Sequence, residues 1–464
     1  MLDRKNTVFI GSMADKSRYQ GAGSSHINPW KLISTREACP DVAYAKGCNE
    51  DGSTNEVLLQ EALEVAKNKE TVVVFAGLTD SYEAEGYDRE TMQMPPGHIH
   101  MIEEIAKVNP NVVVVLMTGS VVEIPWYDKV KGILYMGLCG AAGGEAIANL
   151  LFGSVNPSGR LAEIWPLRYE DCICSDYYGN RFKDAQYREG IYVGYRYYES
   201  AEVEVRFPFG YGKSYTEFQY SDLKIKGKSV TCKVKNIGKV TGKEVVQLYI
   251  EPKQSKAYRA KRELKGFSKI ELNPGEEKIV EFQLEERSFS IWNDGWKIPE
   301  GYYDICIGKD SHTMILSEEL EISESKKNSL FVPDEIKEQK IPDWYKELKG
   351  VPTKADFEQL LGRKIEEKSL KKGEFTMENT VMEMKEFSLI MKIMFKIIER
   401  LMARGFDGKV DYNNPSYKMM VAMASDCSMT GMKNNAQMDH HLLEGLVMMA
   451  NGHFLQGIRE MFRK

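Results

Sequence analysis

Two long β-branched runs in the first third of the chain constrain its fold more than any other feature. Residues 71–78 read TVVVFAGL and residues 111–117 read NVVVVLM, so neither run alternates between apolar and polar positions. A strand with this pattern has to be covered on both faces, which is typical of parallel sheets enclosed between helices. Apolar residues at helical spacing in 58–67 and 98–108, before and after the first run, supply such helices.

Further signals extend this pattern over the N-terminal region. Shorter apolar runs at 7–11 (TVFIG) and 132–138 (GILYMGL) predict two more strands, and GGEAIANLLFG at 143–153 predicts a helix that ends at glycine. Ser53 and Glu56 have the spacing of a capping box at the start of the first long helix. Strands and helices that alternate in this way predict βαβ units and a mainly parallel sheet.

The period of the apolar residues also divides the chain into regions. From about residue 215 the period changes to two, in short stretches such as SVTCKVKNIG and EVVQLYIEP, which predicts a small antiparallel β-sandwich. A charged segment follows, and the last part of the chain reads helical and rich in methionine. The predicted fold class is therefore α/β plus all-β. The predicted regions are an α/β sandwich domain (1–166), a connecting segment (167–214), a β-sandwich (215–322), a charged linker (323–350) and a helical extension (351–464).

The composition is that of a folded protein without the excess positive charge that binds nucleic acid or anionic lipid. Of 464 residues, 42% are hydrophobic and the net charge is −6, so neither nucleic acid nor a membrane is an expected partner. The most apolar stretch, 387–402, is interrupted by charged residues and predicts an amphipathic helix rather than a membrane span. Eight cysteines without a secretion signal predict a reducing, cytoplasmic location, and the seven scattered histidines predict no metal or other cofactor.

The loop after the first β-branched run holds the most chemistry. Residues 77–92 read GLTDSYEAEGYDRETM and include Asp80, Glu83, Glu85 and Asp88. Ligands of parallel sheets bind at the carboxyl ends of the strands, where this loop has to lie. Crowded carboxylates can raise the pKa of one member, as a general acid requires. The same pattern is typical of a solvated acidic loop, and spacing alone leaves both interpretations open.

The motif E-G-Y-D-R, directly after a V-V-V-F-A-G-L strand, resembles the acid/base loop of the β-glucosidases of glycoside hydrolase family 3. Further stretches resemble motifs of that family in the order in which the family has them. They are RYQGAGSSHINP (18–29), AGGEAIANLLFGSVNPSGRLAEIWP (142–166), YREGIYVGYRYYE (187–199), FPFGYGKSYTEF (207–218), GKEVVQLYI (242–250) and RELKGFSKIELNPGE (262–276). The resemblance implies an O-glycosyl hydrolase of the β-glucosidase type, in which the β-sandwich is a fibronectin type III-like domain.

The resemblance also implies a departure from the usual architecture of the family. That architecture places a (β/α)8 barrel before the α/β sandwich, and an Asp of the barrel, commonly in an S-D-W context, is the nucleophile. We expect this chain to begin at the sandwich, and none of its Ser-Asp pairs precedes tryptophan. The expected function is the acid/base half of a retaining hydrolase, inactive without a barrel. The alternatives are a non-catalytic remnant that binds a sugar or a partner, and an unrelated α/β enzyme of nucleotide or acyl chemistry.

The resemblance assigns roles at the matching positions. Glu85 of E-G-Y-D-R is the expected acid/base, and Glu83 is the alternative acid, with Glu85 as its helper. Ser24 and Ser25 of the GAGSSH loop are expected to contact a β-glycoside or oligosaccharide substrate in the first subsite, because glycines allow close approach and hydroxyls can donate to sugar oxygens. A simple turn with local hydrogen bonds is the other interpretation of that loop.

Two further expectations concern the acidic loop and the exposed surface. Asp88 and Arg89 are expected to form an ion pair that fixes the loop. Because the family buries its sandwich against the barrel, this chain is expected to expose an apolar face. The expected protein partner is therefore a barrel-containing chain or a second copy of this chain.

Overall fold

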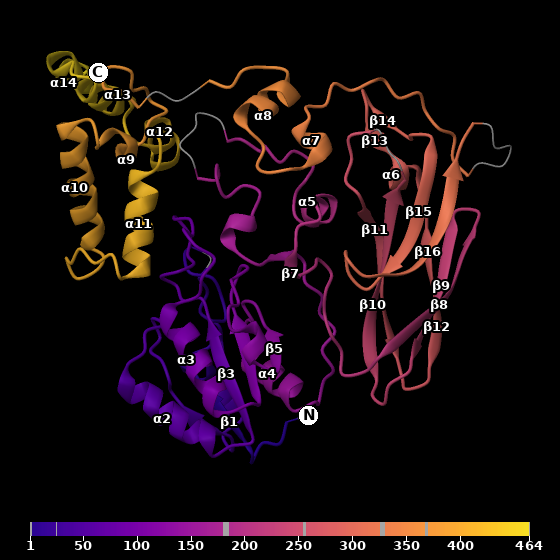
Figure 1. The fold of residues 1–464 in the computed structure, drawn as a ribbon. Helices are drawn as coiled ribbons and strands as arrows, with labels where there is room; N and C mark the ends of the chain where they lie inside the picture. Colours follow the sequence, from indigo (N-terminus) through magenta and orange to yellow (C-terminus); the bar gives the residue numbers. More distant parts are fainter. Residues whose placement is uncertain are drawn as a thin grey trace.

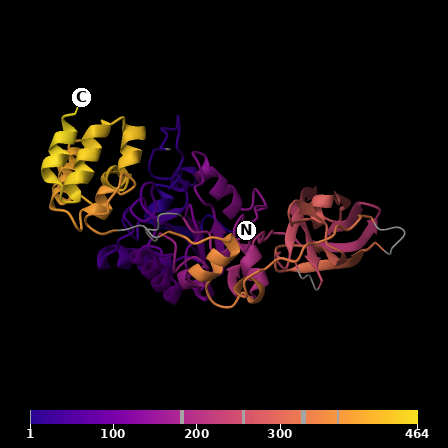
Figure 2. The ribbon, with the colours of Figure 1, turned by 90° about the horizontal axis from the view of Figure 1, so that it is seen from above.

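The computed structural model describes residues 2–24, 26–179, 185–253, 257–324, 330–366 and 370–463. It has an α/β unit, a β-sandwich and a bundle of short helices (Figure 1). Seen from above, the α/β unit lies between the other two (Figure 2). The α/β and all-β parts and the helical C-terminal region agree with the predicted fold class.

The α/β unit is built on a five-stranded sheet with the strand order β2-β1-β3-β4-β5. All four neighbouring pairs are parallel, as the βαβ pattern predicts. The strands are β1 (Thr7–Ile10), β2 (Ala43–Ala45), β3 (Thr71–Gly77), β4 (Val112–Met117) and β5 (Gly132–Tyr135). The helices are α1 (Thr35–Ala38), α2 (Glu56–Lys67), α3 (Pro96–Val108) and α4 (Gly143–Leu151).

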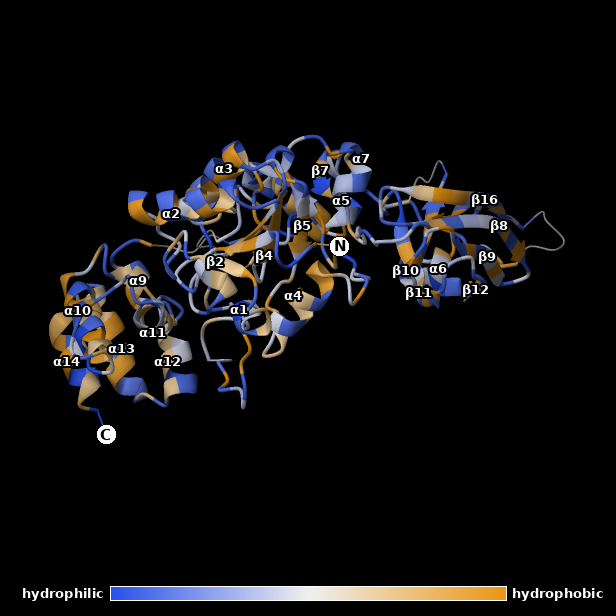
Figure 3. Cartoon of the chain, turned by 90° about the horizontal axis from the view of Figure 1, so that it is seen from below, coloured by the Kyte–Doolittle hydropathy of each residue, from blue (hydrophilic) through white to orange (hydrophobic). Residues whose placement is uncertain are grey.

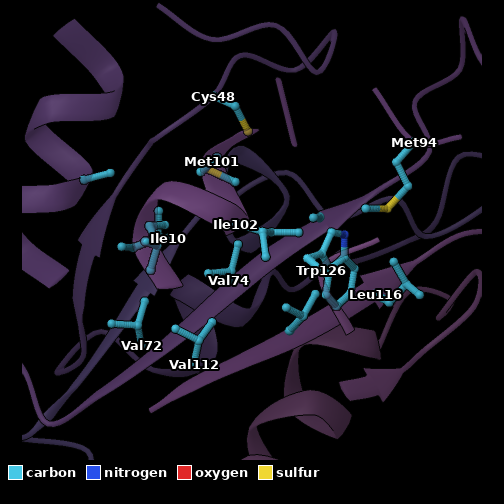
Figure 4. Close-up of a cluster of buried hydrophobic side chains, with 14 of the residues drawn as sticks. Ile10, Cys48, Val72, Val74, Met94, Met101, Ile102, Val112, Leu116 and Trp126 are labelled. Carbon is cyan, nitrogen blue, oxygen red and sulfur yellow. The ribbon is translucent and has the colours of Figure 1, made fainter. Parts of the chain in front are cut away.

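Helices cover both faces of this sheet. Val72 and Val74 of β3 belong to the same buried cluster as Met101 of α3, part of which Figure 4 shows. Val73 and Ile147 of α4 belong to a second cluster on the opposite face. Successive side chains of a strand point to opposite faces. The run TVVVFAGL is therefore apolar throughout because both of its faces are buried.

The start of α2 differs from the prediction. The helix begins at Glu56, and its N-cap is Asn55, whose side chain accepts a hydrogen bond from the Leu58 amide at 3.0 Å. The Ser53 hydroxyl instead donates to Asp51 Oδ1 at 2.6 Å. The predicted Ser53–Glu56 capping box is wrong because the asparagine two residues further on is an equally good cap.

The β-sandwich consists of two antiparallel sheets with the strand orders β11-β10-β15-β16 and β12-β9-β8. Alternate residues such as Val230, Cys232 and Val234 are buried between the sheets, which is the period-two pattern of the sequence. The strands are β8 (Phe218–Lys226), β9 (Ser229–Asn236), β10 (Gly242–Pro252), β11 (Glu263–Leu272), β12 (Glu277–Gln283), β15 (Gly301–Gly308) and β16 (Met314–Ile322). A short helix, α6 (Glu286–Phe289), and the hairpin β13 (Ile291–Trp292) and β14 (Trp296–Lys297) lie at one end.

The segments that connect these units are packed rather than extended. Phe331 is buried in the core of the sandwich, and Trp344 and Tyr345 are buried with tyrosines of the connecting segment. The part of the charged segment that the structure describes is therefore held against the folded units at several points. The elements here are β6 (Trp165–Pro166), α5 (Tyr195–Ser200), β7 (Val205–Phe207), α7 (Trp344–Glu347) and α8 (Lys354–Leu361).

The helical bundle has a core rich in methionine. Met384, Met391 and Met429 are fully buried in it, since unbranched thioether side chains fill irregular gaps between short helices. Apolar residues also remain on the outside of α10 and α14 (Figure 3). Among the described residues, no helix has the length and the apolar character of a membrane-spanning segment. The helices are α9 (Val381–Met384), α10 (Leu389–Ala403), α11 (Pro415–Ser425), α12 (Met429–Ala436), α13 (His440–Ala450) and α14 (Phe454–Met461).

Candidate active site

The candidate site lies where the direction of the sheet's connections reverses. Strands β1 and β3 are neighbours in the sheet. The chain continues from β1 to β2 on one side of this pair, and from β3 to β4 on the other side. Ligands of open α/β sheets bind at such a switch point, beyond the carboxyl ends of the strands. The loops after β1 and β3 meet there through a parallel bridge between Ala22 and Ala84, and the Glu85 amide donates to the Ala22 carbonyl at 3.0 Å.

Glu85 is an exposed carboxylate at this site. Its Oε2 accepts a hydrogen bond from the Ser24 amide at 2.6 Å. Hydrogen bonds from Ser24, through its hydroxyl and its backbone, lower the pKa of Glu85 because they favour the ionised form. The structure therefore brings two of the sequence-predicted site residues together, although they are 61 positions apart.

Gly23 makes this close approach possible. It has a φ of 129°, and a Cβ atom there would lie 2.5 Å from Glu85 Cβ and 2.7 Å from Glu85 Oε2. Any larger residue would push the Glu85 side chain away from the Ser24 amide. Ser24 itself is exposed, and Ser25 lies outside the described residues.

Glu83 has a different environment from Glu85. Its Oε2 accepts from Arg18 Nη1 at 2.6 Å and from the Gly119 amide at 2.9 Å, and its Oε1 accepts from the Ser120 hydroxyl. Arg18 also donates to the backbone carbonyls of Leu78 and Glu83. Glu83 therefore ties together the loops that follow β1, β3 and β4.

The expected Asp88–Arg89 ion pair is wrong. Arg89 Nη1 donates to the Ser120 hydroxyl and to the Val121 carbonyl, both at 2.8 Å, in the loop after β4. Asp88 Oδ1 accepts from the Tyr178 hydroxyl at 3.2 Å. Arg89 does fix its own loop, but by hydrogen bonds to the loop after β4 rather than by an ion pair with Asp88.

Sequence reasoning missed the residues that support the site. Arg18, Gly119 and Ser120 hold Glu83, yet none carries a signal of its own in a single sequence. The Arg18 side chain is 5% exposed. A buried arginine next to a glycine-rich loop indicates a buried acid somewhere in the fold, but only the tertiary structure identifies that acid.

The potential metal ligands that the structure brings together lie elsewhere. His441, Glu444 and Glu460 of α13 and α14 have ligand atoms within 4.8 Å of one another. His441 Nδ1 lies 2.7 Å from Glu460 Oε1, and Arg463 Nη1 lies 3.5 Å from the same oxygen. The first contact joins α13 to α14 and the second lies at the C-terminal end of α14, both outside the loops that carry Glu85.

The α/β unit and the β-sandwich each correspond to a known domain family. Residues 2–215 match the glycosyl hydrolase family 3 C-terminal domain, and residues 244–311 match the fibronectin type III-like domain. The chain therefore belongs to glycoside hydrolase family 3, of which it carries the C-terminal portion.

Known relatives agree with this assignment. The chain is 42% identical over 346 residues to thermostable beta-glucosidase B of Acetivibrio thermocellus, in an alignment that covers 70% of this chain and 46% of the relative. It is 39% identical to an exo-alpha-(1->6)-L-arabinopyranosidase of Bifidobacterium breve, with 66% and 42% covered. The crystal structure of the Bifidobacterium adolescentis GH3 beta-glucosidase superimposes with a TM-score of 0.66 at 37% identity, covering 68% of this chain and 49% of that one. The chain thus spans about half the length of these relatives.

Proposed function

We propose that this chain is the acid/base-bearing half of a retaining β-glucosidase-type hydrolase, with Glu85 as the acid/base and Ser24 and Ser25 beside the sugar. One observation carries the proposal. Glu85 stands exposed at the switch point of the sheet, on a loop whose neighbouring carboxylate, Glu83, is fully engaged in structural bonds. Glu85 can therefore exchange a proton with a bound substrate, whereas both oxygens of Glu83 already accept hydrogen bonds from Arg18, the Gly119 amide and the Ser120 hydroxyl.

In the proposed reaction Glu85 acts in both steps. It first protonates the departing glycosidic oxygen while an Asp of the barrel attacks the anomeric carbon and forms a glycosyl ester. It then removes a proton from the water that hydrolyses this ester, which returns both carboxyl groups to their starting states. The second carboxylate has to stand about 5–5.5 Å away, on the opposite face of the sugar.

In the chain alone, the surroundings of Glu85 favour only the step in which Glu85 acts as a base. Hydrogen bonds from Ser24 lower the pKa of Glu85, so the free chain holds it as a carboxylate, the form that acts as base. A nucleophilic carboxylate and a bound sugar next to Glu85 would raise that pKa through like charge and desolvation. Acid function of Glu85 therefore depends on the barrel.

The proposed partner is a barrel-containing chain, with a second copy of this chain as the other candidate for the exposed surface. Sedimentation velocity over a range of concentrations, with and without a barrel, distinguishes the two. We also propose a cytoplasmic location. All eight cysteines are unpaired, which fits a reducing compartment, and cell fractionation tests this.

The function is tested with the chain and a separately produced barrel domain of a family 3 β-glucosidase. The chain alone should hydrolyse no aryl β-glucoside above background, because one carboxyl group cannot form the glycosyl ester. In the mixture, Glu85→Ala should slow substrates with poor leaving groups about 10²–10⁴-fold more than dinitrophenyl glucosides, whose leaving oxygen hardly needs a proton. Azide should restore turnover of the activated substrate because it replaces the water that needs a base.

Glu83→Ala serves as the matched control. The loss of Glu83 should reduce turnover of both substrate classes alike, without azide rescue, because it loosens the loop. If that variant shows the leaving-group pattern instead, Glu83 is the acid. If no barrel restores activity but glucose still binds in a Ser24-dependent manner, the chain is the non-catalytic sugar-binding remnant.

A further inference from the structure

Helix α11 of the bundle lies on the side that faces the α/β unit, and α10 lies on its other side (Figure 1). One face of the helix is directed toward its own bundle: Tyr417, Val421 and Ser425, spaced four residues apart, are all buried. Tyr417 also donates from its hydroxyl to the Glu399 carbonyl of α10 at 3.2 Å. A helix that is anchored along one face can present the opposite face to another part of the molecule.

The opposite face of α11 contacts both loops of the candidate site. A Cβ atom on Gly86 would lie 3.0 Å from Met419 Cγ and 3.1 Å from Met423 Cγ. A Cβ atom on Gly23 would lie 3.4 Å from Met419 Sδ, in the same space that Glu85 occupies. Met419 therefore packs against the glycine that precedes Ser24 and against the glycine that follows Glu85.

A charged contact fixes the next residue of the loop. Lys418 Nζ lies 3.9 Å from the ring centroid of Tyr87, a cation–π geometry. The Tyr87 hydroxyl donates to the Asp80 carbonyl at 2.8 Å, so this ring closes the Glu85 loop on itself. Helix α11 therefore contacts two consecutive residues of the Glu85 loop, Gly86 and Tyr87.

We propose that α11 holds the acid/base loop in position: Met419 packs against Gly23 and Gly86, and Lys418 holds the ring of Tyr87. We call these contacts the α11 clamp. Its catalytic consequence rests on the function proposed above, whereas the contacts themselves do not. Glycine loses more conformational freedom on folding than any other residue, and Gly23 and Gly86 both have positive φ values, 129° and 89°. Such a loop needs contacts from outside to keep a carboxylate within hydrogen-bonding distance of one amide.

The clamp is tested on the full chain without substrate or barrel. Met419→Ala should raise the hydrogen-exchange rate of the Glu85 amide about tenfold, because the bridge to Ala22 opens more often. The same variant should move the pKa of Glu85, followed by carboxyl ¹³C NMR, upward toward its ordinary value, since the bond from Ser24 is lost. Met420→Ala is the matched control: Met420 is 41% exposed on the same helix, and both readouts should stay as in the wild type.

A second variant keeps the inference falsifiable if Met419→Ala disturbs the bundle. Lys418→Met should speed exchange around Tyr87, and Lys418→Arg should restore the wild-type rate, because arginine preserves the cation over the ring. Unchanged exchange and an unchanged Glu85 pKa in both Met419→Ala and Lys418→Met would overturn the inference. These readouts need no turnover, so an inactive complemented enzyme would count against the proposed function and not against the clamp.

Discussion

At the scale of single residues, the environment separates two glutamates that the sequence places two positions apart. Glu83 accepts from a buried arginine, a backbone amide and a hydroxyl, whereas Glu85 accepts from Ser24 at the surface. Since the two side chains are chemically identical, the different roles that we propose for them depend only on what surrounds them.

Removal of Glu83 should destabilise the α/β unit strongly. Glu83→Ala leaves Arg18, whose side chain is 5% exposed, without its closer charge partner, and should lower the free energy of unfolding by about 3–5 kcal/mol. Asp80→Ala is the control, because Asp80 is 57% exposed and lies 3.6 Å from Arg18 Nε, and it should change stability by less than about 0.5 kcal/mol. Urea denaturation measures both, and similar losses for the two variants would contradict the structural role of Glu83.

At the scale of elements, helix α3 carries a buried histidine onto the end of β3. His98 Nδ1 lies 2.9 Å from the Gly77 carbonyl, and the side chain has no exposure to solvent. Burial lowers the pKa of His98, against smaller opposing effects from the Gly77 hydrogen bond and from the charge of Asp51. The imidazole is therefore neutral in the folded chain at a pH where the unfolded chain already protonates it.

This shift predicts a loss of stability in acid. The unfolded chain binds a proton at His98 below about pH 6.5, the ordinary pKa, while the folded chain does not until the pH reaches the lowered value. The stabilisation that depends on neutral His98 is fully present above about pH 6.5. Between that pH and the lowered pKa of the folded chain, the free energy of unfolding should fall by up to about 1.4 kcal/mol per pH unit. His98→Gln should flatten this part of the pH profile of thermal unfolding, whereas His100→Gln, at an exposed position of the same helix, should not. Identical profiles for the wild type and His98→Gln would refute the assignment.

At the scale of the whole molecule, a buried ion pair joins the α/β unit to the β-sandwich. Arg160 Nη2 lies 2.6 Å from Glu244 Oε2 of β10, with side-chain exposures of 9% and 4%. The Tyr220 hydroxyl donates to the other carboxylate oxygen at 2.7 Å, and Asn156 donates to the Thr241 carbonyl at 3.0 Å. These contacts fix the sandwich to the segment that follows α4.

A double-mutant cycle tests this junction. Arg160→Met should cost about 3–5 kcal/mol, because it leaves the buried Glu244 carboxylate without its cation and with only the Tyr220 hydroxyl as a side-chain partner. Arg160→Met combined with Glu244→Met should recover much of that loss, since two apolar side chains of similar size replace the pair. Urea denaturation of both variants decides the matter, and a double variant as unstable as the single one would mean that the pair acts through packing rather than charge.

Much of the architecture could be predicted from the sequence because it depends on local periodicity. The continuous β-branched runs, the helical spacing between them and the later period of two determined the parallel sheet, the β-sandwich and the place of the acidic loop. Helix boundaries were less certain, because Ser53 and Asn55 are both good caps and only one can start α2.

Only the tertiary structure decided which groups meet around Glu85. Arg18 and Glu83 are 65 positions apart, Ser24 and Glu85 are 61 apart, and Met419 and Lys418 reach the loop from the opposite end of the chain. A single sequence carries no record of such pairings, because side-chain burial and hydrogen bonding between distant segments arise only when the chain is folded. The sequence by itself therefore determined the elements and the loop on which the proposed chemistry rests, and the packing of loops and helix α11 against one another determined the environment of each carboxylate.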